Sequence, residues 1–296
     1  MNSENMLVFG AGYIGRKIAE YLKCPLMRVK IHTYQDIEEQ IEYIREKGYS
    51  DIKIIINAIG YVGENSVDDC EQNQAETYFA NVVVPMLLAD YCLKHNLYFV
   101  HIGSGCMYHY DYETDTPVSE EREPNFFDLA YVRSKIAIEK ILLNRIMTNT
   151  QRILICRIRI PLDDQPNPRN LLDKLLRYDL IIDANNSITY LPEFLKILKI
   201  LIAKEVRGII NLVNTGGLYY PDLLIYYNYL AEKNGFSKHN FDVIDYNKLG
   251  VPRTNLLMSV EKLTSIGIVP RDINKDYKQC VNNYIQNLIK RRDAEC

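Results

Sequence analysis

The sequence predicts an α/β fold with a doubly wound parallel sheet and a smaller C-terminal lobe. Short apolar runs alternate with segments whose apolar residues recur at helical spacing, which is typical of strand–helix–strand units. A glycine-rich turn at 10–15 directly follows the first apolar run. A chain of 296 residues exceeds one average domain and falls short of two large ones, so a second, smaller lobe is expected.

The first half of the chain supplies the elements of this sheet. Buried strands are expected at 6–9, 27–31, 52–56, 98–102 and 153–158. Helices are expected between them at 13–23, 37–47, 73–95 and 130–147. Sheets of this kind bind ligands beyond the carboxyl ends of their strands, so the turns after these strands are where functional residues are expected.

The regular alternation ends in the polar loop 163–169, which contains two prolines and suits a domain boundary or a ligand-facing segment. Segments 187–204 and 208–213 again have the patterns of a helix and a strand. We therefore expect residues 1–160, with 185–214 returning to them, to form the sheet domain. Residues 161–184 and 215–296 are expected to form mainly the second lobe.

Composition narrows the functional classes. Apolar residues make up 47% of the chain and charged residues 25%, as in ordinary soluble domains, and no apolar run approaches the roughly 20 residues of a bilayer span. Residues 1–5 lack the basic start of a secretion signal, so a cytoplasmic location is expected. The formal net charge of −3 argues against nucleic acid as a partner. Seven cysteines without CxxC spacing are expected to be free thiols, and no metal site is expected.

The glycine-rich turn predicts a dinucleotide site in a Rossmann-type domain. Gly10, Gly12 and Gly15, with Tyr13 and Ile14 between them, form a GxGxxG that follows a strand and opens a helix. Glycines let the backbone approach a pyrophosphate, which the helix N-terminus stabilises. The alternative is a purely structural turn. A second turn of small residues after the third strand supports the same site, and it consists of Asn57, Ala58, Ile59 and Gly60.

The second strand indicates which dinucleotide is bound. Its end carries Arg28 and Lys30 rather than an acidic residue, and Asp36 lies somewhat beyond. An acidic residue there would select NAD, whereas cations such as Arg16 and Lys30 accommodate the 2′-phosphate of NADP. We therefore favour NADP(H) and leave NAD(H) open.

A catalytic pair is predicted on the helix at 130–147. Tyr131 and Lys135 are four residues apart and so lie on one helix face. The ammonium of Lys135 is expected to lower the pKa of the Tyr131 phenol toward neutral pH. A surface helix pair is the alternative in a chain with 23 tyrosines. Ser104, which follows the strand at 98–102, completes the expected set, and the pair gains its weight from the order of the glycine-rich turn, Ser104, Tyr131 and Lys135 along the chain.

This order of motifs resembles the extended short-chain dehydrogenase/reductase family. Within that family, the chain is most similar to the bifunctional 3,5-epimerase/4-reductases of UDP-L-rhamnose synthesis, which are relatives of dTDP-4-dehydrorhamnose reductase. The segments that carry the resemblance are 67–71, 81–83, 105–111, 123–126, 157–161, 167–170 and 252–255. One departure is that Phe9 stands where the common GxxGxxG pattern has its first glycine.

The resemblance implies roles for individual residues. Tyr131 donates a proton, Lys135 holds the nicotinamide ribose, and Ser104 polarises the C4 carbonyl of a nucleotide-linked 4-keto-6-deoxyhexose. Cys106 and Lys174 match the pair implicated in epimerisation. The further residues expected to bind cofactor or substrate are Asn81 for the cofactor, and Tyr108, Arg159, Asn170, Arg253 and Asn255 for the sugar nucleotide. A homodimer is left open.

Epimerisation next to a carbonyl explains why such an enzyme needs a cysteine and a lysine. The protons on C3 and C5 are acidic because their loss gives an enolate, and a thiol near a cation is a usable base. Three alternatives stay open. They are a buried structural cysteine in a dTDP-4-dehydrorhamnose reductase without epimerase activity, another nucleotide-sugar enzyme such as a 4,6-dehydratase or 4-epimerase, and a non-catalytic NADP-binding regulatory subunit.

Overall fold

A six-stranded sheet forms the centre of the first of two compact units into which the chain divides. The computed structural model describes residues 3–149 and 152–295. The first unit consists of Met1–Met107, Pro124–Arg157 and Ile197–Ile210. The second consists of Tyr108–Glu123, Ile158–Lys196 and Asn211–Cys296.

The sheet confirms the predicted fold class. Its strand order is β10-β5-β4-β3-β1-β2, and β1 pairs in parallel with both β2 and β3. The strands are β1 (Met6–Phe9), β2 (Leu26–Met27), β3 (Ile54–Asn57), β4 (Tyr98–Ser104), β5 (Ile153–Ile158) and β10 (Gly208–Asn211). The chain steps from β1 to β2 on one side and then returns to β3 on the other. The carboxyl ends of β1 and β3 therefore form a topological switch point, where open α/β sheets bind their ligands.

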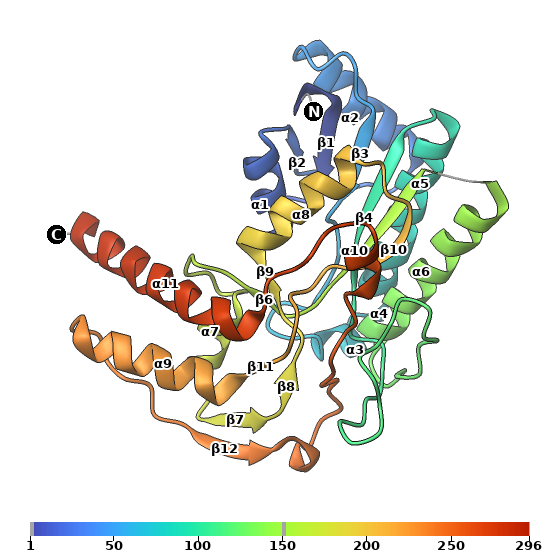
Figure 1. The fold of residues 1–296 in the computed structure, drawn as a ribbon. Helices are drawn as coiled ribbons and strands as arrows, with labels where there is room; N and C mark the ends of the chain where they lie inside the picture. Colours follow the sequence, from blue (N-terminus) through green and yellow to red (C-terminus); the bar gives the residue numbers. More distant parts are fainter. Residues whose placement is uncertain (1–2, 150–151, 296) are drawn as a thin grey trace. The chain divides into compact units, whose positions relative to one another are not determined.

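Helices cover both faces of this sheet (Figure 1). One face packs against α2 (Tyr34–Glu46), α5 (Val84–Lys94) and α6 (Ala130–Asn149), whose buried Ile37, Leu88 and Leu142 share a core with Leu7 and Phe99 of the strands. Helix α1 (Tyr13–Leu22) and the part of α8 (Leu191–Ala203) that belongs to this unit lie on the opposite face. Because helices bury both faces of the sheet, its strands are mainly apolar and do not alternate between polar and apolar residues.

Two predicted elements of this unit differ from the structure. The helix expected at 73–95 is divided into α4 (Gln74–Tyr78), the π-helical turn η2 (Phe79–Val83) and α5, with the short α3 (Asp69–Gln72) before them. The strand expected at 27–31 ends at Met27, because residues 28–33 turn toward the start of α2. There Thr33 and Asp36 form a capping box.

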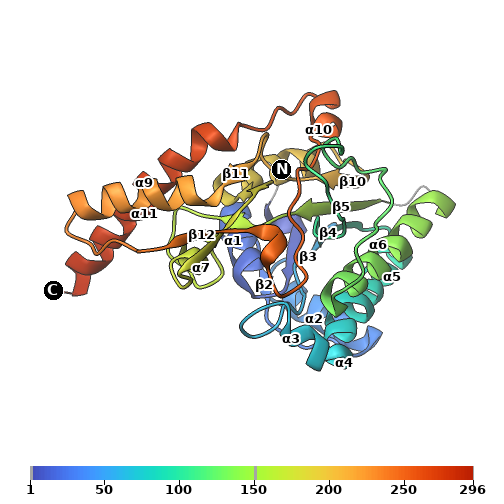
Figure 2. The same cartoon turned by 90° about the horizontal axis from the view of Figure 1, so that it is seen from below.

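The second unit is built from three two-stranded pairs and several helices. Strand β6 (Pro161–Leu162) pairs with β9 (Thr189–Tyr190), β8 (Asn185–Asn186) with β11 (Leu218–Tyr219), and β7 (Leu180–Asp183) with β12 (Asp242–Asp245). Its helices are α7 (Leu171–Leu175), α9 (Tyr220–Lys233), α10 (Glu261–Ser265) and α11 (Ile273–Glu295). Short 3-10 turns are η1 (Ser3–Asn5) in the first unit and η3 (Tyr246–Lys248) in the second. Helices α9 and α11 lie side by side and bury Leu224 and Val281 between them and their neighbours (Figure 2).

The helix expected at 187–204 begins only at Leu191, because Thr189 and Tyr190 form β9.

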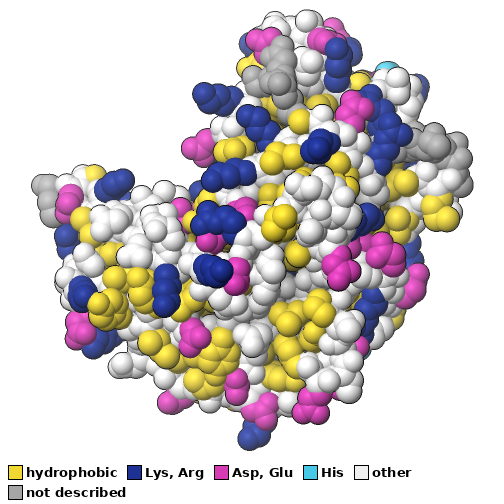
Figure 3. Space-filling view, in the orientation of Figure 1, with side chains coloured by type: hydrophobic (Ala, Val, Ile, Leu, Met, Phe, Trp, Pro, Cys, Tyr) yellow, Lys and Arg dark blue, Asp and Glu magenta, His cyan; other side chains and the backbone are white. Residues whose placement is uncertain are grey.

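Charged side chains of both signs are mixed on the surface of the molecule that Figure 3 shows. Lysine and arginine side chains are interspersed with aspartate and glutamate on the face shown in Figure 3. Six cysteines form no disulfide among the described residues, and the seventh, Cys296, lies outside them. Within residues 3–149 and 152–295, no helix has both the length and the apolar character that crossing a bilayer requires.

Candidate active site

The glycine-rich turn has the geometry that its sequence predicts. Gly10 has a φ of +108°, and a Cβ at that position would lie 2.6 Å from the carbonyl carbon of Ala58. A Cβ on Gly15 would lie 1.8 Å from the carbonyl oxygen of Gly10. These two contacts exclude any side chain, so the turns after β1 and β3 pack directly against each other. Phe9 is the buried last residue of β1, and the glycine that the turn requires is therefore Gly10.

The start of α1 is open to a ligand. Helix α1 begins at Tyr13 with Gly12 at its N-cap, and no side chain caps it. Apart from its own helix and chain neighbours, no described residue has an atom within 4 Å of the position that a Cβ of Gly12 would occupy. The first backbone N–H groups of α1 are thus available to an anion, as the pyrophosphate of a dinucleotide requires. The residues present fit such a cofactor.

The turn after β3 is held by a buried amide and a buried imidazole. Asn57 Oδ1 accepts a hydrogen bond from the Ile59 amide at 3.0 Å, which fixes the orientation of the Asn57 carboxamide. Asn57 Nδ2 therefore donates to Nδ1 of His101 at 3.0 Å. Burial, with a smaller effect of nearby Lys135, holds the pKa of His101 well below its usual value, so the ring is neutral. His101 Nε2 is buried and has no hydrogen-bond partner among the described residues.

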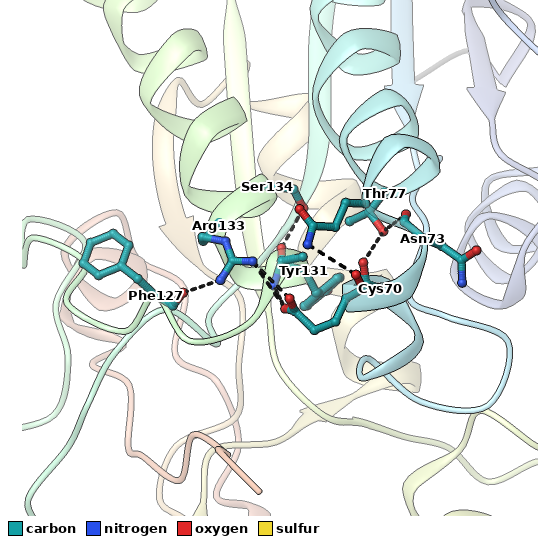
Figure 4. A network of polar contacts seen from close by, with 10 residues as sticks. Cys70, Asn73, Thr77, Phe127, Tyr131, Arg133 and Ser134 are labelled. Atoms are coloured by element: carbon teal, nitrogen blue, oxygen red, sulfur yellow. Dashed lines mark hydrogen bonds and ion pairs between the residues drawn. The ribbon is translucent and has the colours of Figure 1, made fainter.

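Asn81 lies on the π-helical turn η2 and connects the turn after β3 to α6. Its carboxamide accepts from the Tyr61 amide at 2.8 Å and donates to the Tyr61 carbonyl and to Ser134 Oγ, both at 3.0 Å. Ser134 in turn donates to the Tyr131 carbonyl at 2.6 Å (Figure 4). A Cβ on Gly60 would lie 3.1 Å from Asn81 Oδ1 and 3.3 Å from Lys135 Nζ. The turn after β3 and the face of α6 with Lys135 are therefore in close contact.

Three of the predicted catalytic groups meet at the end of β4. Ser104 is the last residue of β4, and its Oγ lies 2.9 Å from Cys106 Sγ. The side chains of Ser104 and Tyr131 are hydrogen-bonded. Lys135 Nζ lies 5.8 Å from the centre of the Tyr131 ring. The structure thus brings Ser104, Cys106, Tyr131 and Lys135 together in the first unit.

The expected lowering of the Tyr131 pKa is wrong. Burial raises the pKa of Tyr131, the neighbouring Cys106 raises it further, and only the hydrogen bond from Ser104 lowers it. Burial also lowers the pKa of Lys135 to about 8, an effect that Cys106 and Cys70 partly oppose. Desolvation disfavours the charged form of both groups and is the largest cause of both shifts. Tyr131 is therefore protonated at neutral pH.

In the second unit, Arg159 is the centre of a buried polar network. Its Nη2 donates to Asn186 Oδ1 at 2.6 Å, and its Nη1 donates to Thr254 Oγ1 at 3.2 Å. Asn186 Nδ2 donates to Asn255 Oδ1 at 3.0 Å. The network therefore links two of the predicted sugar-binding residues, Arg159 and Asn255.

The other predicted residues of the second unit lie in different surroundings. Asn170 is fully buried, and its carboxamide holds the loop 163–165 through both main-chain groups of Asp163. Lys174 lies on α7, where burial and then Arg169 and Arg177 lower its pKa. Tyr108 is fully buried and donates to the Arg122 carbonyl at 3.2 Å, and Arg253 is exposed.

Some contributors to the site were not predicted. Ser134 and His101 join the hydrogen-bonded surroundings of Tyr131 and Lys135, although neither has a sequence signature. Cys70 is buried close enough to Lys135 to affect its pKa. The described residues contain no group of three or more His, Cys, Asp or Glu side chains that could hold a metal ion.

Comparison with known proteins agrees with this geometry. Residues 6–162 match the model of the NAD dependent epimerase/dehydratase family. The chain is 33% identical over 217 residues, 71% of its length, to a trifunctional UDP-glucose 4,6-dehydratase/UDP-4-keto-6-deoxy-D-glucose 3,5-epimerase/UDP-4-keto-L-rhamnose-reductase of Arabidopsis thaliana, of which it covers 32%. The chain therefore spans about a third of the length of this relative.

Two further proteins are similar over most of their length. A bifunctional dTDP-4-dehydrorhamnose 3,5-epimerase/dTDP-4-dehydrorhamnose reductase of Arabidopsis thaliana is 28% identical over 274 residues, which cover 88% of the chain and 87% of that relative. The crystal structure of the L780 UDP-rhamnose synthase from Acanthamoeba polyphaga mimivirus has the same fold, with a TM-score of 0.79 at 23% identity, over 94% of the chain and 98% of that protein. The resemblance stated from the sequence is confirmed, and the chain belongs to the NAD dependent epimerase/dehydratase family.

Proposed function

We propose that the chain converts UDP-4-keto-6-deoxy-D-glucose to UDP-L-rhamnose by 3,5-epimerisation followed by NADPH-dependent reduction of the C4 carbonyl. The observation that carries the proposal is the cluster at the end of β4, where Ser104 contacts both Tyr131 and Cys106. The Ser104 hydroxyl thus contacts both Tyr131, the proposed proton donor of the reduction, and Cys106, the proposed base of the epimerisation. The two relatives with matching activities in their names support the same assignment.

In the reduction, Tyr131 is the proton donor. NADPH, when bound, supplies the hydride that adds to C4 of the sugar. Ser104 Oγ donates a hydrogen bond to the C4 carbonyl oxygen, and the Tyr131 hydroxyl gives its proton to that oxygen as negative charge develops there. The resulting tyrosinate is stabilised by Lys135 and regains its proton from solvent. The raised pKa of Tyr131 keeps the proton in place until it is needed.

In the epimerisation, Cys106 is the base. The hydroxyl that polarises the C4 carbonyl is 2.9 Å from Cys106 Sγ, so a thiolate there lies beside the carbons next to C4. Removal of the C3 or C5 proton by the thiolate leaves an enolate, whose oxygen is stabilised by Ser104. Return of a proton to the opposite face needs an acid, and Lys174 is the residue that the family resemblance implies for this role.

NADPH is the cofactor that the chain's own charges favour. The one acidic candidate near the end of β2, Asp36, accepts hydrogen bonds from the amides of His32 and Thr33 at 2.7 and 2.8 Å and so caps α2. Arg16, Arg28 and Lys30 form no ion pair with another described residue. Free cations without a free carboxylate favour a 2′-phosphate over a ribose diol.

The decisive experiment incubates the chain with UDP-4-keto-6-deoxyglucose and NADPH in D₂O. We expect NADPH oxidation, faster than with NADH, and deuterium at C3 and C5 of the product. The dTDP-linked sugar is compared under the same conditions. If neither sugar supports oxidation of either cofactor, the chain is not this enzyme and the regulatory-subunit alternative replaces the proposal.

The epimerase assignment is tested separately with Cys106→Ala. This variant should incorporate no deuterium at C3 and C5, yet still reduce UDP-4-keto-L-rhamnose that has already been epimerised. Cys24→Ala is the matched control, because Cys24 is also partly exposed and burial raises its pKa to about 11. Deuterium uptake at the wild-type rate in Cys106→Ala would show a reductase without this thiol base.

A further inference from the structure

The segment 67–71 is one of those that carry the resemblance stated above, yet the proposed chemistry gives it no task. Its last residue, Glu71, lies on the short helix α3. The Glu71 carboxylate accepts a hydrogen bond from the backbone N–H of Ala130, which is the first residue of α6 and stands 59 positions later in the chain. This contact connects α3 to the helix that bears Tyr131 and Lys135.

Helix α6 has no capping side chain of its own at this end. The Arg133 amide donates to the Leu129 carbonyl at 2.9 Å, so Leu129 occupies the N-cap position. A leucine side chain cannot accept a hydrogen bond from the first N–H groups of a helix. Glu71 therefore supplies the acceptor from outside the helix, and its negative charge lies at the positive end of the α6 dipole.

Arg133 adds a second connection at the same place. Its Nη2 lies 3.2 Å from Glu71 Oε2, and its Nη1 donates to the Phe127 carbonyl at 2.8 Å (Figure 4). One guanidinium thus joins the loop before α6, the first turn of α6 and the carboxylate on α3. Arg133 also lies one residue from Ser134, whose Oγ holds the Tyr131 carbonyl.

We propose that Glu71, together with Arg133, is a positioning residue that fixes the first turn of α6 and so holds the Tyr131 hydroxyl at Ser104. Tyr131 directly follows the residue that Glu71 binds, and Lys135 lies about one turn further on. The kinetic part of this proposal rests on the proposed reductase function. The structural part concerns only the start of α6.

The same helix offers a matched control. Arg145, near the other end of α6, donates to Asp90 of α5 through Nε at 2.9 Å. The side chains of Arg145 and Asp90 are 23% and 43% exposed, compared with 33% and 36% for Arg133 and Glu71. Arg145 stands 14 residues beyond Tyr131, which corresponds to about 21 Å along the helix. Asp90→Ala therefore breaks a similar ion pair of α6 far from the reacting groups.

Hydrogen exchange and steady-state kinetics are measured on Glu71→Ala, Glu71→Gln and Asp90→Ala. In Glu71→Ala we expect amides 130–135 to exchange about fivefold faster, since one helix cap is lost. We expect kcat for reduction to fall about 10- to 100-fold, with the KM for NADPH changed less than about twofold, because misplacement of the proton donor affects the chemical step. Glu71→Gln keeps an oxygen acceptor for Ala130, so it should retain most of kcat.

Three outcomes would overturn the proposal. Unchanged exchange at 130–135 in Glu71→Ala would show that the carboxylate does not hold the helix start. Faster exchange with an unchanged kcat would show that this position does not matter for the reaction. An equal loss of kcat in Asp90→Ala would make the effect a general loss of stability. If the wild-type chain reduces neither sugar, the proposed function fails, while the exchange measurement still decides whether Glu71 holds α6.

Discussion

Two polar clusters of this molecule, one in each unit, are built for different tasks. In the first unit, Ser104, Tyr131 and Lys135 form a small cluster with displaced pKa values and few hydrogen bonds. In the second unit, Arg159, Asn186 and Asn255 form a chain of direct hydrogen bonds. Phenols and ammonium groups exchange protons, whereas guanidinium and carboxamide groups do not do so near neutral pH. The first cluster can change its protonation state, and the second can only hold its geometry.

Burial has opposite consequences in the two clusters. A buried group that can lose or gain a proton responds to desolvation by shifting its pKa, as Tyr131 and Lys135 do. A buried guanidinium cannot respond in this way, so it must be satisfied by neighbours. We therefore expect substitutions in the first cluster to affect the reaction more than stability, and substitutions in the second to affect stability first.

The largest expected effect is that of Tyr131→Phe. Removal of the hydroxyl takes away the proton donor and should lower kcat for reduction about 10³-fold, with NADPH affinity changed less than about threefold. Stopped-flow measurement of NADPH oxidation and a fluorescence titration of cofactor binding test the two parts. Tyr98→Phe is the control, because Tyr98 is a buried tyrosine of the same unit whose hydroxyl donates to the Val206 carbonyl. A similar loss of kcat in both variants would contradict a special role of Tyr131.

Local patterns in the sequence predicted much of the first unit. The need for glycine at 10 and 15 follows from a tight turn between a strand and a helix, and the spacing of Tyr131 and Lys135 follows from helical geometry. The resemblance to known enzymes gave Ser104 its role and added Cys106 to the candidates.

Contacts between distant segments could not be predicted in this way. The π-helical turn that presents Asn81 interrupts a pattern that is helical throughout, so periodicity gave no sign of it. The capping of Ala130 by Glu71 joins residues 59 positions apart. The predicted lowering of the Tyr131 pKa was wrong because the spacing of the residues reveals that Lys135 is a neighbour but does not reveal the burial of either group.

The next effect in size tests the second cluster. Arg159→Leu removes a donor for Asn186 Oδ1, which is fully buried, and for Thr254, which is half-buried. We expect the free energy of unfolding to fall by about 3 kcal/mol, measured by urea denaturation. Arg292→Leu is the control, since Arg292 is exposed and its contacts with Asp293 and the Asn234 carbonyl, both at 3.4 Å, and with the Phe236 ring lie at the surface, so its loss should cost less than about 1 kcal/mol. A loss below about 1 kcal/mol for Arg159→Leu would contradict the structural role of this cluster.

The smallest expected effect is a pH dependence that Lys135 adds to the first cluster. The pKa of Lys135 is lowered by burial from 10.5 to about 8 in the folded chain. Between these two values the unfolded chain binds more protons than the folded one, so the free energy of unfolding rises with pH in this window. Lys135 lowers the free energy of unfolding below about pH 8, and this destabilisation diminishes as the pH rises.

Lys135→Met removes this titration while keeping a long apolar side chain at a site that is 6% exposed. The wild-type chain should therefore gain stability relative to Lys135→Met between about pH 8 and about pH 10, by at most about 1.4 kcal/mol per pH unit. Urea denaturation of both proteins without cofactor measures the difference, because all other groups titrate in both and cancel. A stability difference that is independent of pH would mean that Lys135 keeps its ordinary pKa, and the first cluster would then resemble the second in holding its charges fixed.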